Sequence, residues 1–223
     1  MNMHCKLTLV GVAAMAAALA AAGAVAPADG VRPLPPPMPA GRMSLEEAIR
    51  LRRSVRQFAN KPLTIAQIGQ MCWAGQGITD PRRGFRAAPS AGALYPMELY
   101  VVTPEGVEHY RPKDHCLERH LAGDHRRALH EHGRVQEAVQ TAPATFVIAA
   151  EIERSAGKYR DRAERYCFME AGHIAQNILL QATALRLGGV PIGGIDDDQV
   201  AETLQLPKGY RVLYVLPVGY PLE

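Results

Sequence analysis

The sequence lacks several features that would assign it to a common class of protein. It has no basic arm or lysine-rich run, and the formal net charge of its 223 residues is only +3. The electrostatic surface of a nucleic-acid-binding protein is therefore not expected. None of its four cysteines forms a CxxC pair, and without Cys5 an odd number remains, which argues against a disulfide framework. No internal repeat is present, and no GxGxxG motif follows a predicted strand, so a dinucleotide-binding Rossmann unit is not expected.

The first 43 residues read as targeting and spacer sequence. Residues 1–26 combine one early lysine, an alanine-rich apolar stretch and small residues before Pro27, which is the plan of a secretory signal peptide. An uncleaved membrane anchor is the alternative, because the stretch is about as long as a span needs. Residues 27–43 form a proline-rich linker, which cannot become a helix. We therefore expect an exported protein, periplasmic or secreted, attached to a membrane only if the N-terminal segment is retained.

Residues 44–223 are expected to form one α+β domain, because 48% hydrophobic residues suffice for a core of ordinary size. Capping patterns predict helices that begin at Ser44, Thr64 and the aspartates at 196–198. Apolar and β-branched runs predict strands over 97–103, 107–110, 144–152 and 211–218. With a long helix before the aspartates, this order predicts a mostly antiparallel or mixed sheet covered by helices.

Six of the eight histidines lie between His109 and His132, which raises the question of a metal site. Their steps are mostly five residues, whereas ligands on one helix face would be three or four residues apart. We therefore expect no metal and interpret the segment as solvent-exposed and partly helical.

The long helix near the C-terminus combines an apolar face with a neighbouring polar stripe of Glu170, His173, Asn177 and Gln181. Such a stripe is costly to bury unless its polar atoms are satisfied. After the helix, Gly193 and Gly194 allow the backbone to approach a flat ligand closely, because no Cβ intervenes. A core helix, its C-cap and an ordinary turn are the alternative interpretation.

Two other stretches suggest ligand binding, one of an anion and the other of a planar ring. Guanidinium groups at Arg52, Arg53 and Arg56 could bind phosphate bidentately, although arginines at a helix end also suit the helix dipole. A second stretch is rich in small residues and could lie flat against a planar ring: Pro89, Ser90, Ala91, Gly92 and Ala93.

Taken together and in order, these stretches resemble the nitroreductase family, most closely its SagB-type dehydrogenase branch. The resemblance covers roughly Ser44 to Pro221. It is carried by Arg52-Arg53-Ser54-Val55-Arg56-Gln57-Phe58, the Pro89–Pro96 loop, Glu170-Ala171-Gly172-His173-Ile174-Ala175-Gln176-Asn177 and Gly193-Gly194. It implies a nitroreductase-like fold with FMN as cofactor, and a homodimer that holds the flavin at the subunit interface.

The resemblance also implies roles for individual residues. Arg52, Arg53, Ser54 and Arg56 would face the phosphate and the pyrimidine edge of the flavin. Pro89, Ser90, Ala91, Gly92 and Ala93 would lie beside the ring, and Gly193 with Gly194 near its reactive edge. Lys158 and Tyr159 resemble the Lys–Tyr pair that removes a proton in the SagB-type branch, the alternative being a lysine and tyrosine on a helix shoulder. Many relatives carry a basic pair near the C-terminus that is missing here, so phosphate binding depends on the N-terminal arginines unless Arg211 or Lys208 contributes.

The activity implied is hydride transfer between FMN and a small-molecule or peptide substrate, for example oxidation of an azoline ring to an azole. Two alternatives stay open: a reductase that uses NAD(P)H to reduce nitro compounds or quinones, and an exported flavin-binding or accessory protein without turnover. Since no twin-arginine pair precedes the apolar segment, export would require the flavin to be acquired after translocation.

Overall fold

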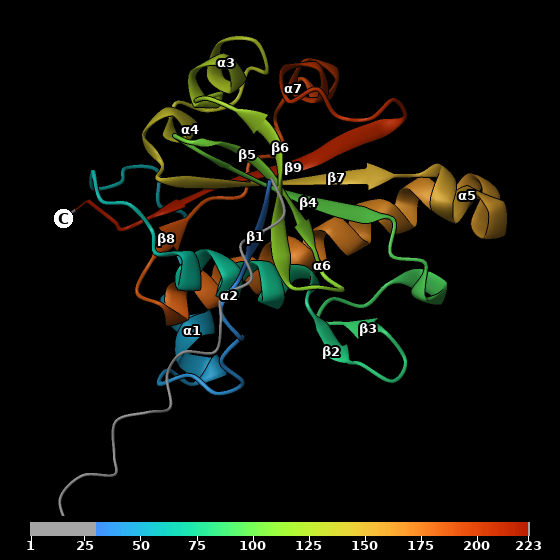
Figure 1. Cartoon of the computed structure of the whole chain (residues 1–223), viewed down its shortest axis with the longest axis horizontal. Coiled ribbons are helices and arrows are strands. Elements are labelled where there is room, and N and C mark those ends of the chain that lie inside the picture. The colour runs from blue at the N-terminus through green and yellow to red at the C-terminus, as the bar shows by residue number, and fades with distance from the viewer. Residues whose placement is uncertain (1–29, 223) are drawn as a thin grey trace, which may run out of the picture.

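The fold, seen in a computed structural model that describes residues 30–222, is built on a seven-stranded sheet. The strands follow the order β1-β6-β5-β4-β7-β9-β8 and every neighbouring pair is antiparallel (Figure 1). Their bounds are β1 Val31–Pro33, β4 Met97–Thr103, β5 Gly106–Arg111, β6 Cys116–Ala122, β7 Ala144–Glu151, β8 Gly188–Gly189 and β9 Tyr210–Gly219. A separate hairpin pairs β2 Ile78–Asp80 with β3 Phe85–Arg86.

Helices cover both faces of the sheet, as Figure 1 shows, with α2 and α6 below it and α3, α4 and α7 above it. The helices are α1 Leu45–Leu51, α2 Ile65–Gln76, α3 Arg126–Glu131, α4 Ala138–Thr141, α5 Glu153–Tyr159, α6 Ala163–Ala184 and α7 Asp197–Thr203, with 3-10 turns η1 Ala91–Ala93 and η2 Arg160–Arg162. Strand residues alternate between the two faces, and each face therefore has its own apolar core. Phe146 and Ile148 belong to the core between the sheet and α6, whereas Val147 and Ala149 belong to the core between the sheet and α3, α4 and α7.

The predicted helix starts are confirmed in atomic detail. Ser44 Oγ accepts a hydrogen bond from Glu47 N, and Thr64 forms a complete capping box with Gln67. Asp196 accepts from Gln199 N, so the aspartates begin a helix, as their position indicated. The expected α+β architecture, with a mostly antiparallel sheet between helices, is confirmed.

The histidine segment is partly helical, as predicted, but it also contains strand β6 and the end of β5. His109 and His120 lie in strands β5 and β6, and only His130 falls inside the short helix α3. Tyr100 stacks on His109 at 4.6 Å between ring centroids. Strand β6 escaped prediction because Glu118, Arg119 and His120 stand between its apolar residues Leu117 and Leu121.

The segment expected to be a linker is partly built into the domain. Val31–Pro33 pairs with β6, Leu34 is buried, and the backbone of Met38 exchanges two hydrogen bonds with the Gln70 side chain. The boundary at Ser44 is therefore too late, although the segment is non-helical as its prolines require. Residues 1–26, the expected signal peptide, lie outside the described residues. Within residues 30–222, no helix has both the length and the apolar character that crossing a bilayer demands.

Candidate functional site

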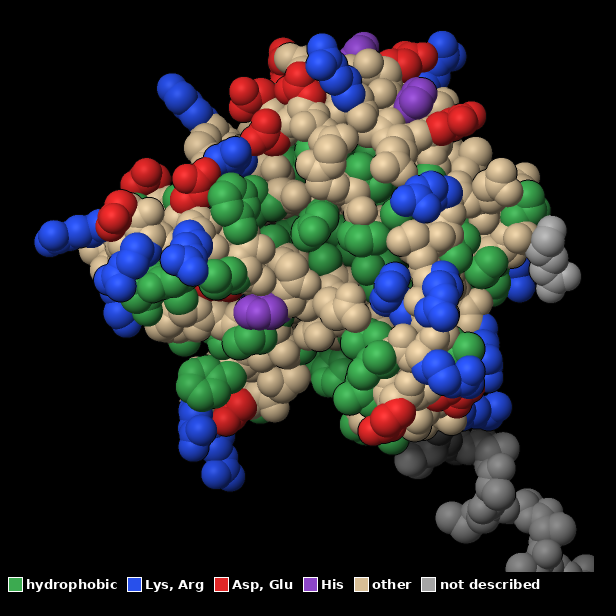
Figure 2. All heavy atoms as spheres, turned by 180° about the vertical axis from the view of Figure 1, so that it is seen from behind, with side chains coloured by type: hydrophobic (Ala, Val, Ile, Leu, Met, Phe, Trp, Pro, Cys, Tyr) green, Lys and Arg blue, Asp and Glu red, His purple; other side chains and the backbone are tan. Residues whose placement is uncertain are grey.

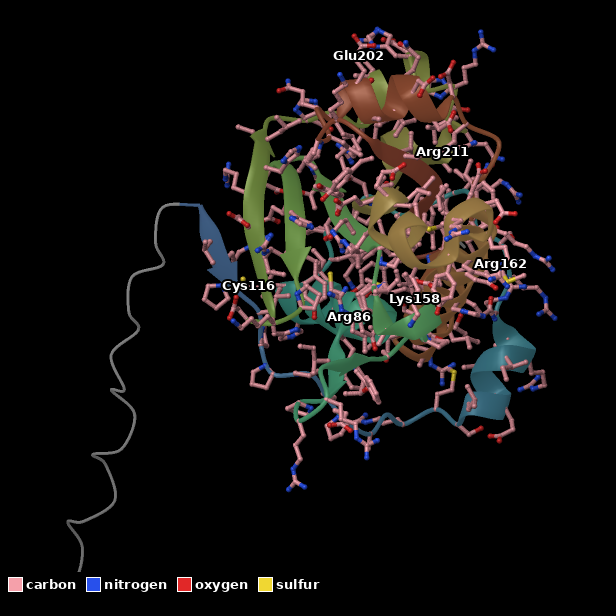
Figure 3. The ribbon with its side chains drawn as sticks, turned by 90° about the vertical axis from the view of Figure 1, so that its right-hand side faces the viewer. Arg86, Cys116, Lys158, Arg162, Glu202 and Arg211 are labelled. Atoms are coloured by element: carbon pink, nitrogen blue, oxygen red, sulfur yellow. The ribbon has the colours of Figure 1, made fainter. Side chains whose placement is uncertain are left out.

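The loop Pro89–Ala93 and the pair Lys158–Tyr159 lie against each other, although 66 residues separate Gly92 from Lys158 in sequence. Gly92 has φ +64°, and a methyl group added there would lie 2.7 Å from the Tyr159 hydroxyl and 2.8 Å from Lys158 Nζ. Only glycine leaves room for both polar groups and adopts this backbone conformation at low cost. Lys158 is exposed in the single chain and Tyr159 is half-buried, its ring packed edge-on against Tyr166. Figure 3 looks onto this end of the molecule, where Lys158 is labelled.

The same loop is attached to α6 by a buried carboxylate. Glu170 Oε1 accepts a hydrogen bond of 2.8 Å from the backbone N–H of Ala91, while Ser90 Oγ accepts from Tyr95 N. Burial raises the pKa of Glu170, and the hydrogen bonds from the loop offset only part of this effect. Glu170 is thus a buried member of the predicted polar stripe with its partner inside the protein, and Gln181 accepts from Gln70 Nε2 at 3.2 Å, whereas His173 is exposed.

The arginine segment runs beside the strand that follows α6. Ser54 forms a parallel bridge with Gly189, and Val55 N donates to Gly189 O at 3.1 Å. Gly188 is packed against the Val55 side chain so closely that a Cβ would lie 2.5 Å from it. The backbone of the segment is therefore fixed while Arg53, Ser54 and Arg56 stay exposed and Arg52 is half-buried.

Arg56 lines a cavity of about 420 Å³ between the arginine segment, α4 and Leu222 near the C-terminus. Its Nε donates to Gln136 Oε1 at 3.1 Å, which leaves both terminal nitrogens of the guanidinium group available to an anion. Arg53 instead donates to the carbonyl oxygens of Arg50 and Arg52. Gln136 gave no signal in the sequence, because the contact joins residues that are 80 positions apart.

The glycine turn, Gly193–Gly194, lies next to the loop between α3 and α4, which also contains Gln136. Asp196 N donates to Gly133 O at 2.9 Å, and Ile192 pairs with Val215 of β9. Gly193 and Gly194 are both exposed, and only the Tyr214 ring lies near Gly193. The turn therefore presents bare backbone to solvent, as the two adjacent glycines predicted.

Arg211 does not supply the missing basic pair. It binds Asp197 at 2.7 Å and also pairs with Glu164. These hydrogen bonds and charges outweigh desolvation and hold the pKa of Arg211 above its ordinary value. The charge of Arg211 is therefore already matched by carboxylates of the same chain.

The predicted residues form two groups at opposite ends of α6. The loop Pro89–Ala93 is attached at Glu170, whereas the arginine segment contacts Gly188 and Gly189 beyond Ala184. The stretch of α6 from Glu170 to Ala184 spans about 21 Å at about 1.5 Å per residue. Figure 1 agrees, since α1 lies at one end of α6 and α5 at the other.

The face opposite to the view of Figure 1 carries apolar side chains across its middle, with lysines and arginines toward both sides (Figure 2). Two surfaces without bulky side chains, Gly92–Ala93 and Gly193–Gly194, suit a planar ligand. Exposed guanidinium groups at one end suit a charged tail on that ligand. These residues therefore fit a flavin nucleotide. Within residues 30–222, no group of three or more His, Cys, Asp or Glu side chains is placed to hold a metal ion.

Comparison with known proteins decides the family. The model of the nitroreductase family matches residues 49–220. The chain belongs to the nitroreductase family. The prediction made from the four motifs is thereby confirmed, and membership implies a flavin cofactor and oxidoreductase chemistry.

Individual relatives span almost the whole domain. A protein of Methanocaldococcus jannaschii named as a nitroreductase, MJ1384, is 40% identical over 187 residues, 81% of this chain and 93% of that protein. A crystal structure of a protein from Ralstonia eutropha, also named as a nitroreductase, superposes with a TM-score of 0.80 at 30% identity, covering 86% of this chain and 90% of that one.

Two further relatives differ in what they are named for. The microcin B17-processing protein McbC of Escherichia coli is 28% identical over 171 residues, 71% of this chain and 62% of McbC. The E. coli microcin synthetase McbBCD complex, with truncated pro-MccB17 bound, matches with a TM-score of 0.67 at 25% identity, over 82% of this chain and 76% of that one. The NADPH-flavin oxidoreductase of Vibrio harveyi is 27% identical over 183 residues, 78% of this chain and 65% of that protein.

Proposed function

We propose that this protein is an FMN-dependent oxidoreductase of the SagB type, which removes a hydride and a proton from an azoline-like ring in a small molecule or peptide. One observation carries the proposal: the Lys158 amine and the Tyr159 hydroxyl lie together on the left-handed backbone of Gly92. A basic group and a hydroxyl beside a bare backbone surface are what proton removal from a flat substrate requires. Similarity to McbC, a peptide-processing protein, supports the same substrate class.

One set of residues binds the cofactor and another acts on the substrate. When bound, FMN supplies the two-electron acceptor for the hydride. Arg52, Arg56 and Ser54 hold its phosphate end, and Gly193 with Gly194 admit the ring. Lys158 takes the proton that leaves with the hydride, and Tyr159 orients the substrate through its hydroxyl.

We infer further that the working unit is a homodimer with the flavin between subunits. The two groups of site residues lie at opposite ends of α6, so one flavin reaches both if the second group comes from a partner chain. Large apolar side chains on α1 and α6 are exposed in the single chain: Leu45, Ile49, Phe168 and Met169. Solvent-exposed apolar side chains of this size on neighbouring helices are typical of an interface. We also propose that residues 1–26 direct export.

Anaerobic titration tests the activity. Purified protein is expected to be yellow, to release FMN on denaturation, and to lose its flavin absorbance when one equivalent of an azoline peptide is added. Lys158→Met should abolish this bleaching without releasing FMN. Bleaching by NADPH followed by reoxidation with a nitroaromatic, and none by the azoline, would instead favour a nitro or quinone reductase. A flavin that no donor reduces would identify an accessory protein.

A comparison of two ligands tests the phosphate site. Arg52→Ala with Arg56→Ala should weaken FMN binding at least tenfold, because both guanidinium groups are lost, and should leave riboflavin binding unchanged, since riboflavin has no phosphate. Arg50→Ala, at the end of the same helix, is the matched control. Equal losses for FMN and riboflavin would reject the assignment of these arginines.

A further inference from the structure

The short helix α5, which carries Lys158 and Tyr159, is poorly fixed by its own sequence. It has seven residues, and its N-cap Ile152 makes no side-chain hydrogen bond. At its end, Arg160 has φ +51°, a conformation that costs about 1–2 kcal/mol for a residue with a Cβ. A helix of two turns without a cap is marginal in water. Its position must therefore be set by contacts with the rest of the domain.

Arg154, in the first turn of α5, makes these contacts in three directions. Its Nε donates to Glu151 Oε2 at 2.9 Å, and its Nη2 donates to Glu98 Oε1 of β4 at 2.7 Å. Its Nη1 donates to the carbonyl oxygen of Tyr95 at 2.5 Å. One planar guanidinium group thus joins α5, the sheet and the end of the loop that contains Gly92, with the directional geometry that arginine provides and lysine does not.

The partner carboxylate is itself held in place and charged. Glu98 Oε2 lies 2.9 Å from His109 Nε2, and the Glu98 side chain is only 14% exposed. Burial alone would raise the pKa of Glu98, but hydrogen bonds from His109 and Arg154 outweigh it and hold the pKa below its ordinary value. Charge-assisted hydrogen bonds of this kind are about twice as strong as neutral ones.

Tyr95, the loop residue that Arg154 binds, is strained. Its φ of +48° is unusual for an aromatic residue, and such a conformation persists only where several contacts enforce it. Arg154 supplies one of them, and Ser90 Oγ accepts the Tyr95 N–H. On the other side, Tyr95 Oη accepts from Arg86 N, and the Arg86 guanidinium stacks on its ring at 4.6 Å.

We propose that Arg154 is a positioning residue for the Lys158–Tyr159 pair: by binding Tyr95 O and Glu98 together, it sets the distance between α5 and the backbone of Gly92. This inference deepens the proposed function and rests on it for the catalytic meaning of the pair. Arg154 does not contact substrate or cofactor. It acts through the loop and through the helix, and adds to the hydrogen bond of 2.9 Å from Glu151 N to Pro96 O.

Fluorine NMR on the full chain labelled with 3-fluorotyrosine tests the positioning directly. Resonances of Tyr95, Tyr159 and Tyr220 are assigned by Tyr→Phe substitution. In Arg154→Met, the Tyr95 and Tyr159 resonances should shift or broaden, while Tyr220, which contacts Lys61 and Gln67 instead, stays in place. Arg111→Met, which removes an exposed arginine–glutamate pair at the sheet surface, is the matched control and should change none of the three.

Turnover supplies the second measurement. Arg154→Met should lower the rate of flavin bleaching by an azoline peptide about tenfold to a hundredfold, the scale on which misplacement acts, and change FMN affinity less than twofold. Arg154→Lys keeps the positive charge and is expected to fold even if the methionine variant does not. Lysine cannot donate hydrogen bonds to Glu151, Glu98 and Tyr95 at once, so this variant should show the same displaced Tyr159 resonance.

The outcomes separate the two proposals. An unchanged Tyr159 resonance in a folded Arg154 variant, or equal changes at Tyr159 and Tyr220, would overturn the positioning role, because the residue would then be dispensable or merely stabilising. If no azoline peptide bleaches the flavin of the wild-type protein, the proposed function fails. The NMR comparison still decides whether Arg154 positions the Lys158–Tyr159 pair.

Discussion

At the scale of single residues, Glu170 links the Pro89–Ala93 loop to α6 through a carboxylate that burial makes harder to ionise. The folded protein therefore holds a proton on Glu170 more tightly than the unfolded chain does. The resulting contribution to stability is complete below the ordinary carboxyl pKa and is lost as the pH rises through the raised value.

Glu170→Gln removes this titration but keeps an oxygen that accepts from Ala91 N. We expect the melting temperature of the variant to fall less between pH 5 and pH 8 than that of the wild type, by a few degrees at about 2–4 °C per kcal/mol. Thermal unfolding followed by circular dichroism measures the slope. Glu153→Gln, an exposed change on α5, is the control, and an identical slope in the Glu170 variant would contradict the prediction.

Gly92 combines two constraints that a pair of variants can separate. Gly92→Ala should cost about 1–2 kcal/mol for the left-handed backbone and should also displace Lys158 and Tyr159, which lie within 3 Å of the new methyl group. Gly84→Ala has the same backbone cost, with φ +69° and nothing within 4 Å.

Denaturant unfolding should therefore show the same backbone cost in both variants. Gly92→Ala should lose somewhat more stability, because its methyl group also displaces Lys158 and Tyr159. Only Gly92→Ala should reduce azoline oxidation. Full activity in Gly92→Ala would mean that the close approach of Lys158 and Tyr159 to this backbone has no role in the reaction.

At the scale of elements, β1 is the strand whose presence changes the boundary of the domain. It covers the edge of β6, and Leu34 beside it is buried in the main core. Burial of a leucine side chain stabilises by about 1.5–3 kcal/mol, and an uncovered strand edge promotes association with other chains.

A chain that starts at Ser44 should melt several degrees lower than one that starts at Gly30, and should aggregate more readily. The chain that starts at Gly30 should match the full-length protein in melting temperature. Equal stability of all three would show that the strand pairing of residues 31–33 contributes nothing measurable, and would restore Ser44 as the practical boundary.

At the scale of the whole molecule, the separation of the two groups of site residues along α6 is the reason we propose that the cofactor site depends on assembly. Ile49 is 55% exposed and Met169 is 47% exposed, which is unusual for apolar side chains of this size in a protein that works alone. Aspartate at both positions would place charge in an apolar interface, where an unpaired charge costs several kcal/mol.

Ile49→Asp with Met169→Asp should therefore convert a dimer to a monomer and release FMN together with it. Light scattering after gel filtration gives the mass, and absorbance near the flavin band gives the occupancy. Met38→Asp, equally exposed on the N-terminal segment, should change neither. A wild-type monomer that retains stoichiometric FMN would contradict the interfacial site.

The sequence by itself determined three helix starts, at Ser44, Thr64 and Asp196, as well as the helical period of α6, four strand runs and the family. These features are local, since caps, alternation and glycine pairs act over a few residues and leave a pattern in the chain. Strand β6 was missed because the adjacent charges of Glu118 and Arg119 interrupt its apolar residues. Strand β1 was missed because its prolines suggested a free linker, although an edge strand needs few backbone donors and tolerates proline.

Only the tertiary structure decided which of these local features meet. The approach of Lys158 and Tyr159 to Gly92, the support of Arg56 by Gln136 and the three-way binding of Arg154 each join residues that lie far apart in the chain. Such contacts depend on how α5, α6 and the sheet pack, and packing depends on the whole set of buried side chains. The residue types suited to the chemistry can therefore be predicted from the sequence. The distances between these residues, and their division between the two ends of α6, follow from the fold.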